Sequence, residues 1–268
     1  MTSPLPRLLL SIGAVAIWAS ITLVVPTLLI DSEISLQDLV TTHLAWGVAG
    51  AALFLAVTAW LAGWRDLGFR APSPPGWWKL LWLPALYLAG LAAVGLTTGK
   101  LDPAAVTIVL INTAMVGFSE ELAFRGVLWG GARKALSFWP AFLLVSLAFG
   151  SVHVFNAVLT GELAGAEVQA LNAFMSGGAY LAIRIRTHSI IPIMVIHAAW
   201  DFVVFLVGSG ATKAAAPDPD LLQQQLTFGL ILTGPLFLYG LWLVRSERVR
   251  AGWRDDGAQP PAHPAGAT

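Results

Sequence analysis

The chain has 268 residues, of which 57% are hydrophobic and only 11% are charged, and its formal net charge at pH 7 is zero. A soluble domain carries about 25% charged residues, so this composition disfavours a soluble globular protein, and the zero net charge supplies no field to attract nucleic acid. Cysteine is absent, which excludes disulfides, thiolate metal ligands and a cysteine nucleophile.

The apolar residues fall into long runs, which indicates helices that cross a lipid bilayer. Eight runs are long enough to cross about 30 Å of hydrocarbon at about 1.5 Å per residue. The fourth is longer than it needs to be and is expected to tilt or break near Gly126, Gly130 and Gly131. The predicted spans are residues 7–30, 42–63, 77–97, 104–132, 137–158, 166–184, 189–208 and 225–244.

The Lys and Arg residues orient these spans, because short cytoplasmic loops are enriched in positive charge. With a cytoplasmic N-terminus, 13 of the 15 basic residues fall on the inside, and only Lys100 and Lys213 fall outside. The sequence therefore predicts an all-α polytopic transmembrane helix bundle of about eight helices with both termini cytoplasmic. Residues 1–250 are expected to form a single transmembrane domain, and the Pro-, Gly- and Ala-rich residues 251–268 a disordered C-terminal tail.

Ionisable residues inside the predicted spans are rare, and those present cluster in three of them. A charged residue at the centre of a membrane helix costs roughly 2.5–3.5 kcal/mol on insertion scales. Such residues normally face the protein interior and pair with one another, so we expect a functional site here. The cluster comprises Glu120, Glu121 and Arg125 in the fourth span, His153 in the fifth, and His197 and Asp201 in the seventh.

Helical spacing predicts how these side chains pair. Glu121 and Arg125 are four residues apart on one helix face and can form an ion pair. Glu120 points about 100° away around the helix, so it is free to face a cavity. His197 and Asp201 also lie four residues apart and would present an imidazole and a carboxylate together.

Several of these residues also have an ordinary structural explanation. A single intramembrane His such as His153 is more often a hydrogen-bond partner between helices than a catalyst, and the pair Glu121–Arg125 can be purely structural. Asn112 is interpreted as an interhelical hydrogen-bonding residue. Phe149 shares a helix face with His153, and its ring can shield the imidazole from solvent.

Taken in order, three motifs resemble those of the CPBP family, the CAAX proteases and bacteriocin-processing enzymes, and in particular the type II CAAX prenyl endopeptidases. They are E-E-L-A-F-R at 120–125, F-G-S-V-H at 149–153 and H-A-A-W-D at 197–201. Each motif alone is weak, but all three in order inside apolar spans are specific. The resemblance covers about residues 104–205, which would form the catalytic core of an intramembrane protease.

The resemblance implies a role for each residue. Glu120 would be the general base that activates the hydrolytic water, and His153 would orient that water or share its proton. His197 and Asp201 would polarise the scissile carbonyl or stabilise the oxyanion. Many members carry Asn where this chain has Asp201, and an ionised Asp cannot donate a hydrogen bond. Asp201 would therefore have to be protonated, orient His197 or bind a metal. In this reading the supporting residues are Glu121, Arg125 and Phe149.

The sequence leaves the cofactor open. Glu120, His153 and His197 could form a zinc (Zn) site with water as the fourth ligand, as in a metalloprotease. The H-E-x-x-H arrangement of ordinary zinc proteases is absent, and a metal-free glutamate mechanism is also argued for the CAAX branch. No other cofactor is expected.

These features predict an intramembrane endopeptidase that hydrolyses a peptide bond of a membrane-associated protein or peptide, in a bacterial cytoplasmic membrane. The expected partners are that substrate and the lipid bilayer, without nucleic acid, and the oligomeric state is not predicted. A non-catalytic membrane scaffold or a bacteriocin self-immunity protein of the same fold is the alternative. A proton-coupled transporter would also use intramembrane carboxylates, but no broken helix pair in matching halves supports it.

Overall fold

The computed structural model describes residues 4–29, 34–210 and 219–254. These residues form helices and connecting loops without a strand, so the predicted all-α class is confirmed. In chain order the helices are α1 (Pro4–Leu29), α2 (Leu36–Thr42), α3 (Trp46–Leu61), η1 (Trp77–Leu81), α4 (Trp82–Thr98), α5 (Pro103–Glu121), η2 (Leu122–Leu128), α6 (Trp129–Ala135), α7 (Phe138–Val152), η3 (His153–Asn156), α8 (Ala157–Thr160), α9 (Leu163–Thr187), α10 (Ile191–Gly208), α11 (Pro219–Leu243) and α12 (Glu247–Ala251).

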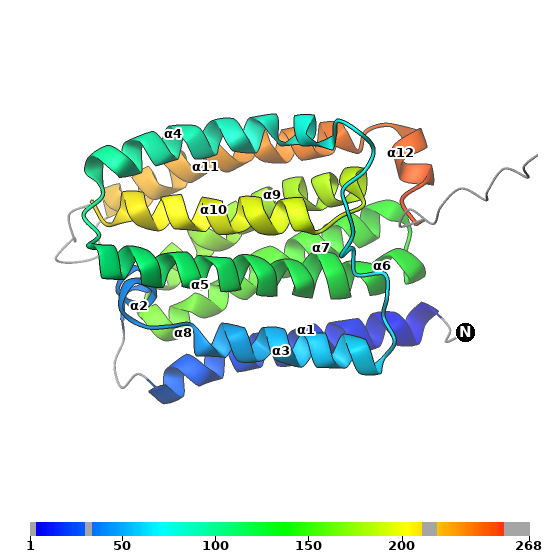
Figure 1. Cartoon of the computed structure of the whole chain (residues 1–268), viewed down its shortest axis with the longest axis horizontal. Helices are drawn as coiled ribbons and strands as arrows, with labels where there is room; N and C mark the ends of the chain where they lie inside the picture. Colours follow the sequence, from blue (N-terminus) through cyan, green and yellow to red (C-terminus); the bar gives the residue numbers. More distant parts are fainter. Residues whose placement is uncertain (1–3, 30–33, 211–218, 255–268) are drawn as a thin grey trace, which may run out of the picture.

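The long helices lie side by side along one direction and form a bundle (Figure 1). α1 packs on α3 and α6, α5 packs on α10, and α9 packs between α7 and α11. Large apolar side chains remain exposed around the bundle, as on Trp60 (79%) and Leu96 (80%). Since exposed apolar area of this extent is unusual for a soluble monomer, the outer surface suits a lipid environment.

Six of the described helices are long and apolar enough to cross a membrane. The pair α2–α3, bent by 80°, is a seventh candidate if it counts as one span. The predicted span at 166–184 falls in α9, which is not among the six by composition. α9 is enclosed by α7 and α11, and a helix that faces protein rather than lipid needs little hydropathy. The chain is a multi-pass membrane protein, and the number of eight spans stays a prediction.

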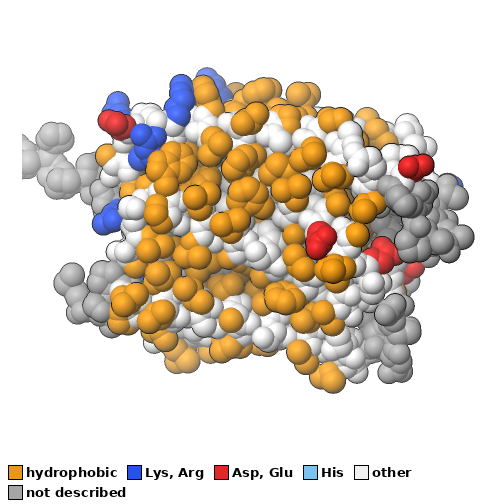
Figure 2. Space-filling view, turned by 180° about the vertical axis from the view of Figure 1, so that it is seen from behind, with side chains coloured by type: hydrophobic (Ala, Val, Ile, Leu, Met, Phe, Trp, Pro, Cys, Tyr) orange, Lys and Arg blue, Asp and Glu red, His pale blue; other side chains and the backbone are white. Residues whose placement is uncertain are grey.

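The two ends of the bundle differ in charge. The N-terminus and α12 lie at the same end (Figure 1). Figure 2 shows Lys and Arg side chains gathered toward one end of the face in view, with apolar side chains over its middle. The cytoplasmic location of both termini stays a prediction from the distribution of Lys and Arg.

The fourth predicted span is not broken at its glycines. A π-helix, η2, begins directly after Glu121 and continues into α6, so the helix is rewound rather than interrupted. Gly130 and Gly131 serve a different purpose, because α1 crosses α6 there. A Cβ at Gly131 would lie 2.6 Å from the Ser11 hydroxyl, and one at Gly130 would lie 2.7 Å from the Arg7 guanidinium. Small residues are what let two membrane helices approach this closely.

The beginning of the predicted disordered tail is ordered. Ala251 ends α12, and the buried ring of Trp253 lies 5.2 Å from that of Trp129 and 5.4 Å from that of Phe138. The remainder of that prediction, residues 255–268, lies outside the described residues.

Asp66, in the loop after α3, fastens the basic end of the bundle. Its carboxylate oxygens lie 2.8 Å from Arg7 Nη2, 2.9 Å from Arg133 Nη2 and 2.8 Å from Lys134 Nζ. Burial alone would raise the pKa of Asp66, but the hydrogen bonds from Lys134 and Arg7 and the charges of Arg7 and Arg133 outweigh it and lower that pKa. One carboxylate thus joins α1 and α6.

Replacing Asp66 by Asn is expected to lower the free energy of unfolding by about 2 kcal/mol, because charge-assisted hydrogen bonds are lost. Because the folded-state pKa is depressed, this contribution is fully present above the unfolded-state value of about 3.9, and it decreases progressively as the pH falls from that value toward the folded-state pKa. Unfolding in detergent at pH 7 and pH 3 measures both effects. The exposed Glu167→Gln variant is the control, and equal stabilities of the Asp66→Asn protein and the parent at pH 7 would contradict the prediction.

Candidate active site

The first of the site helices, α5, begins at a strong cap. Asp102 Oδ1 accepts hydrogen bonds from the backbone N–H groups of Ala104 and Ala105 at 2.8 and 2.9 Å, and Pro103 occupies the first turn. Both features favour a helix start. α5 then runs without interruption to Glu121, so its cap fixes the register at which the two glutamates emerge.

α5 and α10 pack closely where the site forms. A Cβ at Gly117 would lie 2.8 Å from the Met194 carbonyl oxygen and 3.0 Å from the Ala198 Cβ. This contact between small residues brings the glutamates of α5 next to His197 on α10. The third contributor, α7, ends at Val152 and continues as the 3₁₀-helix η3, which begins at His153. Short π and 3₁₀ segments of this kind often mark functional sites.

A cavity of about 520 Å³ reaches this cluster. It separates the seven residues singled out in the sequence into two groups. Those that line the cavity are Glu120, His153, His197 and Asp201. Those that lie outside its lining are Glu121, Arg125 and Phe149.

Glu120 faces two imidazoles across the cavity. Its Oε2 atom lies 3.9 Å from His153 Nε2 and 3.7 Å from His197 Nε2. This oxygen is buried and makes no direct hydrogen bond. At these separations neither imidazole forms a direct hydrogen bond with the carboxylate. The arrangement therefore places a carboxylate and two imidazole nitrogens around a common point.

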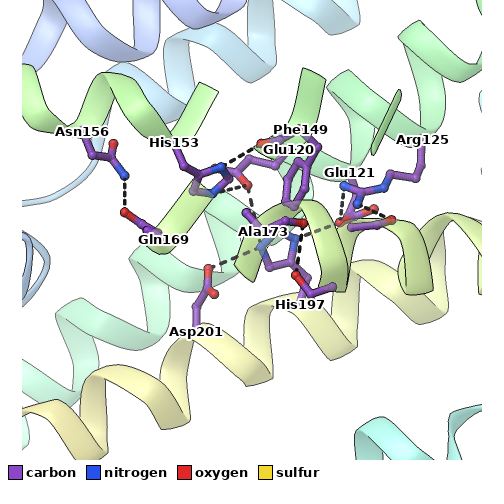
Figure 3. A network of polar contacts seen from close by, with 12 residues as sticks. Glu120, Glu121, Arg125, Phe149, His153, Asn156, Gln169, Ala173, His197 and Asp201 are labelled. Carbon is purple, nitrogen blue, oxygen red and sulfur yellow. Dashed lines mark hydrogen bonds and ion pairs between the residues drawn. The ribbon is translucent and has the colours of Figure 1, made fainter. Parts of the chain in front are cut away.

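Glu121 holds His197 through Nδ1, the ring nitrogen that does not face Glu120 (Figure 3). Glu121 Oε1 lies 2.8 Å from His197 Nδ1 and also accepts a hydrogen bond of 3.1 Å from Arg125 Nη1. Arg125 Nη2 donates in turn to the Gly177 carbonyl oxygen at 2.9 Å. The predicted Glu121–Arg125 pair is present and fully buried, with both side chains 0% exposed. It is more than a self-neutralising pair, because the same carboxylate oxygen fixes an imidazole of the cavity.

His153 is oriented by its own helix. Its Nδ1 atom lies 2.8 Å from the Phe149 carbonyl oxygen, which can only accept, so Nδ1 carries the proton. The Phe149 ring meets the His153 ring at 5.0 Å and the His197 ring at 5.8 Å, edge to face in both cases. The guanidinium carbon of Arg125 lies 4.0 Å above the same ring. Phe149 therefore covers both imidazoles, as its spacing predicted for His153.

These contacts fix what each imidazole presents to the cavity. Nδ1 of both histidines is engaged as a donor, so Nε2 of the neutral ring directs a lone pair toward Glu120. Asp201 Oδ2 lies 3.5 Å from His197 Nε2, on the cavity side. Of the three roles that the sequence left open for Asp201, orientation of His197 through Nδ1 is taken by Glu121.

The donor set does not fit a metal as arranged. Among the described residues, no group of three or more His, Asp or Glu side chains converges closely enough to hold an ion. Two ligands about 2.1 Å from a tetrahedral zinc would lie roughly 3.4 Å apart. The distances of Glu120 Oε2 to the two Nε2 atoms, 3.7 and 3.9 Å, are longer.

Sequence reasoning missed Gly177 and Tyr180 as neighbours of the site. Gly177 supplies the carbonyl that receives Arg125, and the Tyr180 ring lies 5.7 Å from that of His197. The available signal was the run Ser176–Gly178 in the middle of a long helix, since small residues mark close helix contacts in membranes.

Replacing Gly177 by Ala is expected to destabilise the protein by about 1–3 kcal/mol, the usual effect of overpacking a core. The new Cβ would lie 2.6 Å from Phe149 Cδ1 and 2.9 Å from Arg125 Nη2, so both must move. Gly90→Ala on α4 is the matched control, because a Cβ there meets nothing within 4 Å. Thermal unfolding in detergent measures both variants, and similar midpoints would contradict the prediction.

Comparison with known proteins finds one family that this region resembles. Residues 102–203 match the model of a family described as type II CAAX prenyl endopeptidase Rce1-like. Neither the curated proteins nor the solved structures that were compared gave a match. The match includes α5, η2, α7, α9 and all but the last turns of α10, and thus every side chain of the site. The part of the chain that builds the site, residues 102–203, is therefore similar to the type II CAAX prenyl endopeptidase family.

Proposed function

We propose that this chain is an intramembrane endopeptidase in which Glu120 activates water to hydrolyse a peptide bond of a membrane-associated protein or peptide. The observation that carries the proposal is the position of Glu120 Oε2, 3.7 and 3.9 Å from two imidazole Nε2 atoms inside a cavity. Amide hydrolysis requires a base for water, a donor for the oxyanion and an acid for the leaving amine.

In the first step a water molecule donates a hydrogen bond to Glu120 and is oriented by the lone pair of His153 Nε2. Its oxygen attacks the scissile carbonyl carbon as its proton passes to Glu120. A C–O bond forms, and the carbonyl π electrons move onto the oxygen. The product is a tetrahedral oxyanion with a protonated Glu120 beside it.

The oxyanion needs a hydrogen-bond donor, which we assign to the pair His197 and Asp201. Because His197 Nδ1 already donates to Glu121, its Nε2 atom can donate only when both ring nitrogens are protonated. A protonated Asp201 would donate directly. When the intermediate collapses, the C–N bond breaks and Glu120 returns its proton to the leaving amine, so the site is regenerated.

Glu121, Arg125 and Phe149 act as positioning residues in this proposal, because none of them lines the cavity. Glu121 selects the protonated nitrogen of His197, as the buried carboxylate of a hydrolase triad does. Arg125 holds Glu121 and is itself anchored on the Gly177 carbonyl.

We propose that hydrolysis does not depend on a bound metal. Protein purified after extensive washing with a zinc chelator is expected to retain its activity, with metal content measured on the same sample. Zinc would supply a Lewis acid and an acidic bound water, so the zinc alternative predicts loss of activity on washing and recovery with Zn²⁺. That recovery would overturn the metal-free proposal.

The substrate is proposed to be a peptide or membrane-protein segment in a bacterial cytoplasmic membrane. Membrane proteomes of cells that carry the parent chain, the Glu120→Gln variant and the exposed Glu162→Gln variant test both activity and substrate. We expect a peptide that accumulates only with Glu120→Gln. If no peptide accumulates and the phenotype of the parent is kept, the chain is a scaffold and the proposed function is wrong.

A further inference from the structure

Two amide side chains form a pair in the cavity, and the proposed hydrolysis does not use them. Asn156 Nδ2 donates a hydrogen bond of 2.8 Å to Gln169 Oε1, and both residues line the cavity (Figure 3). Asn156 belongs to η3 and Gln169 to α9, two elements that pack against each other. The pair therefore joins two walls of the cavity that also contains the candidate catalytic residues.

The geometry of η3 places this pair one helical turn from His153. Residues three apart on a 3₁₀-helix lie above each other, and one turn rises about 6 Å. Asn156 follows His153 by three residues, and both line the cavity. Since an extended peptide advances about 3.4 Å per residue, the pair lies about two substrate residues from the point at which His153 faces Glu120.

The other amide and hydroxyl side chains of the lining are engaged in the fold. Asn112, predicted to bond between helices, makes three hydrogen bonds with the backbone at the bend between α2 and α3. The hydroxyls of Thr22 and Thr113 donate to carbonyl oxygens of their own helices. In contrast, Asn156 Oδ1 and Gln169 Nε2 have no partner among the described residues, and neither is one of the fully buried polar atoms.

These two remaining atoms are a hydrogen-bond acceptor and a hydrogen-bond donor side by side. Exchanging the oxygen and nitrogen of both amides would still leave one of each, so the combination does not depend on that assignment. The N–H and C=O of one extended residue point to the same side and need one acceptor and one donor, as in a β-ladder. Because a half-satisfied amide in an apolar cavity is costly, a ligand that completes both bonds is favoured.

Resting on the proposed function, we infer that the pair Asn156–Gln169 binds the backbone N–H and C=O of one substrate residue, about two positions from the scissile bond. Binding there sets which peptide bond meets Glu120. Because the contacts are made to the backbone, they do not depend on the side chain of that substrate residue. The structural alternative is a hydrogen bond that only links η3 to α9.

The inference is tested with a short, end-blocked peptide of alternating Ala and Leu and with its all-ester analogue, in which oxygen replaces every backbone N–H. Binding is measured as slower reaction of a maleimide with Thr22→Cys, which lies in the cavity lining of a chain without native cysteine. All proteins carry Glu120→Gln, so the peptide is not hydrolysed. Ser246→Cys, exposed and outside the lining, is the labelling control.

We expect the peptide to bind about 2–10-fold more tightly than the ester, the usual net effect of a hydrogen bond. Asn156→Leu with Gln169→Met keeps the approximate size of both side chains without the amides and should abolish this preference. Gln169→Met alone serves if the double variant does not fold. Exchange of the two amides, Asn156→Gln with Gln169→Asn, should retain the preference. An unchanged preference in the Leu/Met protein would overturn the inference, as would a peptide that fails to slow labelling.

The outcome is distinguishable from that of the proposed function, because this binding assay requires no hydrolysis. If the preference depends on the pair but no peptide accumulates in the proteomes, the proposed function alone is wrong. If a peptide accumulates with Glu120→Gln but the preference is independent of the pair, this inference alone is wrong. In protein that retains Glu120, loss of the pair should also allow cleavage at neighbouring bonds of the accumulated peptide, and cleavage at the parent position alone would contradict the inference.

Discussion

Replacing Glu120 by Gln is expected to lower turnover about 10²–10⁴-fold, the range that a positioned general base contributes. Gln has nearly the same shape and stays within the same cavity, but its amide cannot accept the proton of the attacking water. Glu120 Oε2, the oxygen between the imidazoles, makes no direct hydrogen bond, so the change removes no hydrogen bond of the fold there. Substrate affinity and thermal stability should therefore change little.

Hydrolysis of the peptide that accumulates with the Glu120→Gln variant provides the assay, using purified protein in detergent. Glu162→Gln is the matched control, because Glu162 is exposed and lies outside the cavity lining. Turnover within a factor of a few of the parent in the Glu120→Gln protein would exclude Glu120 as the base. Loss of activity in both variants would instead indicate damage to the fold.

The second large effect is expected at Arg125, on stability rather than on chemistry. Arg125→Met leaves the Glu121 carboxylate fully buried without its cation, and breaking a buried ion pair from one side costs about 3–5 kcal/mol. The same change releases the Gly177 carbonyl oxygen and removes the cation above the Phe149 ring. The midpoint of unfolding in a detergent titration should therefore be much lower for Arg125→Met than for the parent protein.

A double variant separates charge from shape. Glu121→Gln with Arg125→Met removes both charges, so it should recover much of the stability lost in Arg125→Met alone. Its activity should stay low, because the side chain at position 121 would then be a neutral amide, and His197 Nδ1 would no longer face a carboxylate. A double variant as unstable as the single one would show that Arg125 acts through its packing and its bond to Gly177, not through Glu121.

The sequence predicted the features that the bilayer and the helical repeat constrain most strictly. Long apolar runs, rare intramembrane charges and the distribution of Lys and Arg predicted an all-α membrane bundle, and the structure has that class. The i,i+4 spacing predicted the Glu121–Arg125 pair, found at 3.1 Å, and the shielding of His153 by Phe149. These features depend on one helix at a time, for which spacing is sufficient.

Contacts between helices were decided by the tertiary structure. Glu121 rather than Asp201 holds His197 Nδ1, because the close approach of α5 and α10 at Gly117 sets their rotation about each other. The glycine pattern overstated the fourth span's tendency to break, since Gly130 and Gly131 accommodate α1.

By itself, then, the sequence determined the class of the fold, the membrane environment and the set of polar residues that gather inside it. The reason is that a charged side chain inside the bilayer is energetically costly, so the few that occur there can be recognised from the sequence. The position of the cavity decided which of these residues can contact a substrate and which can only support the others. Four of the residues line it, and the other three lie outside it, where they orient or cover the two histidines. That division depends on side chains from α5, η2, α7, η3 and α10 meeting in space, a relation that is absent from the order of residues along one chain.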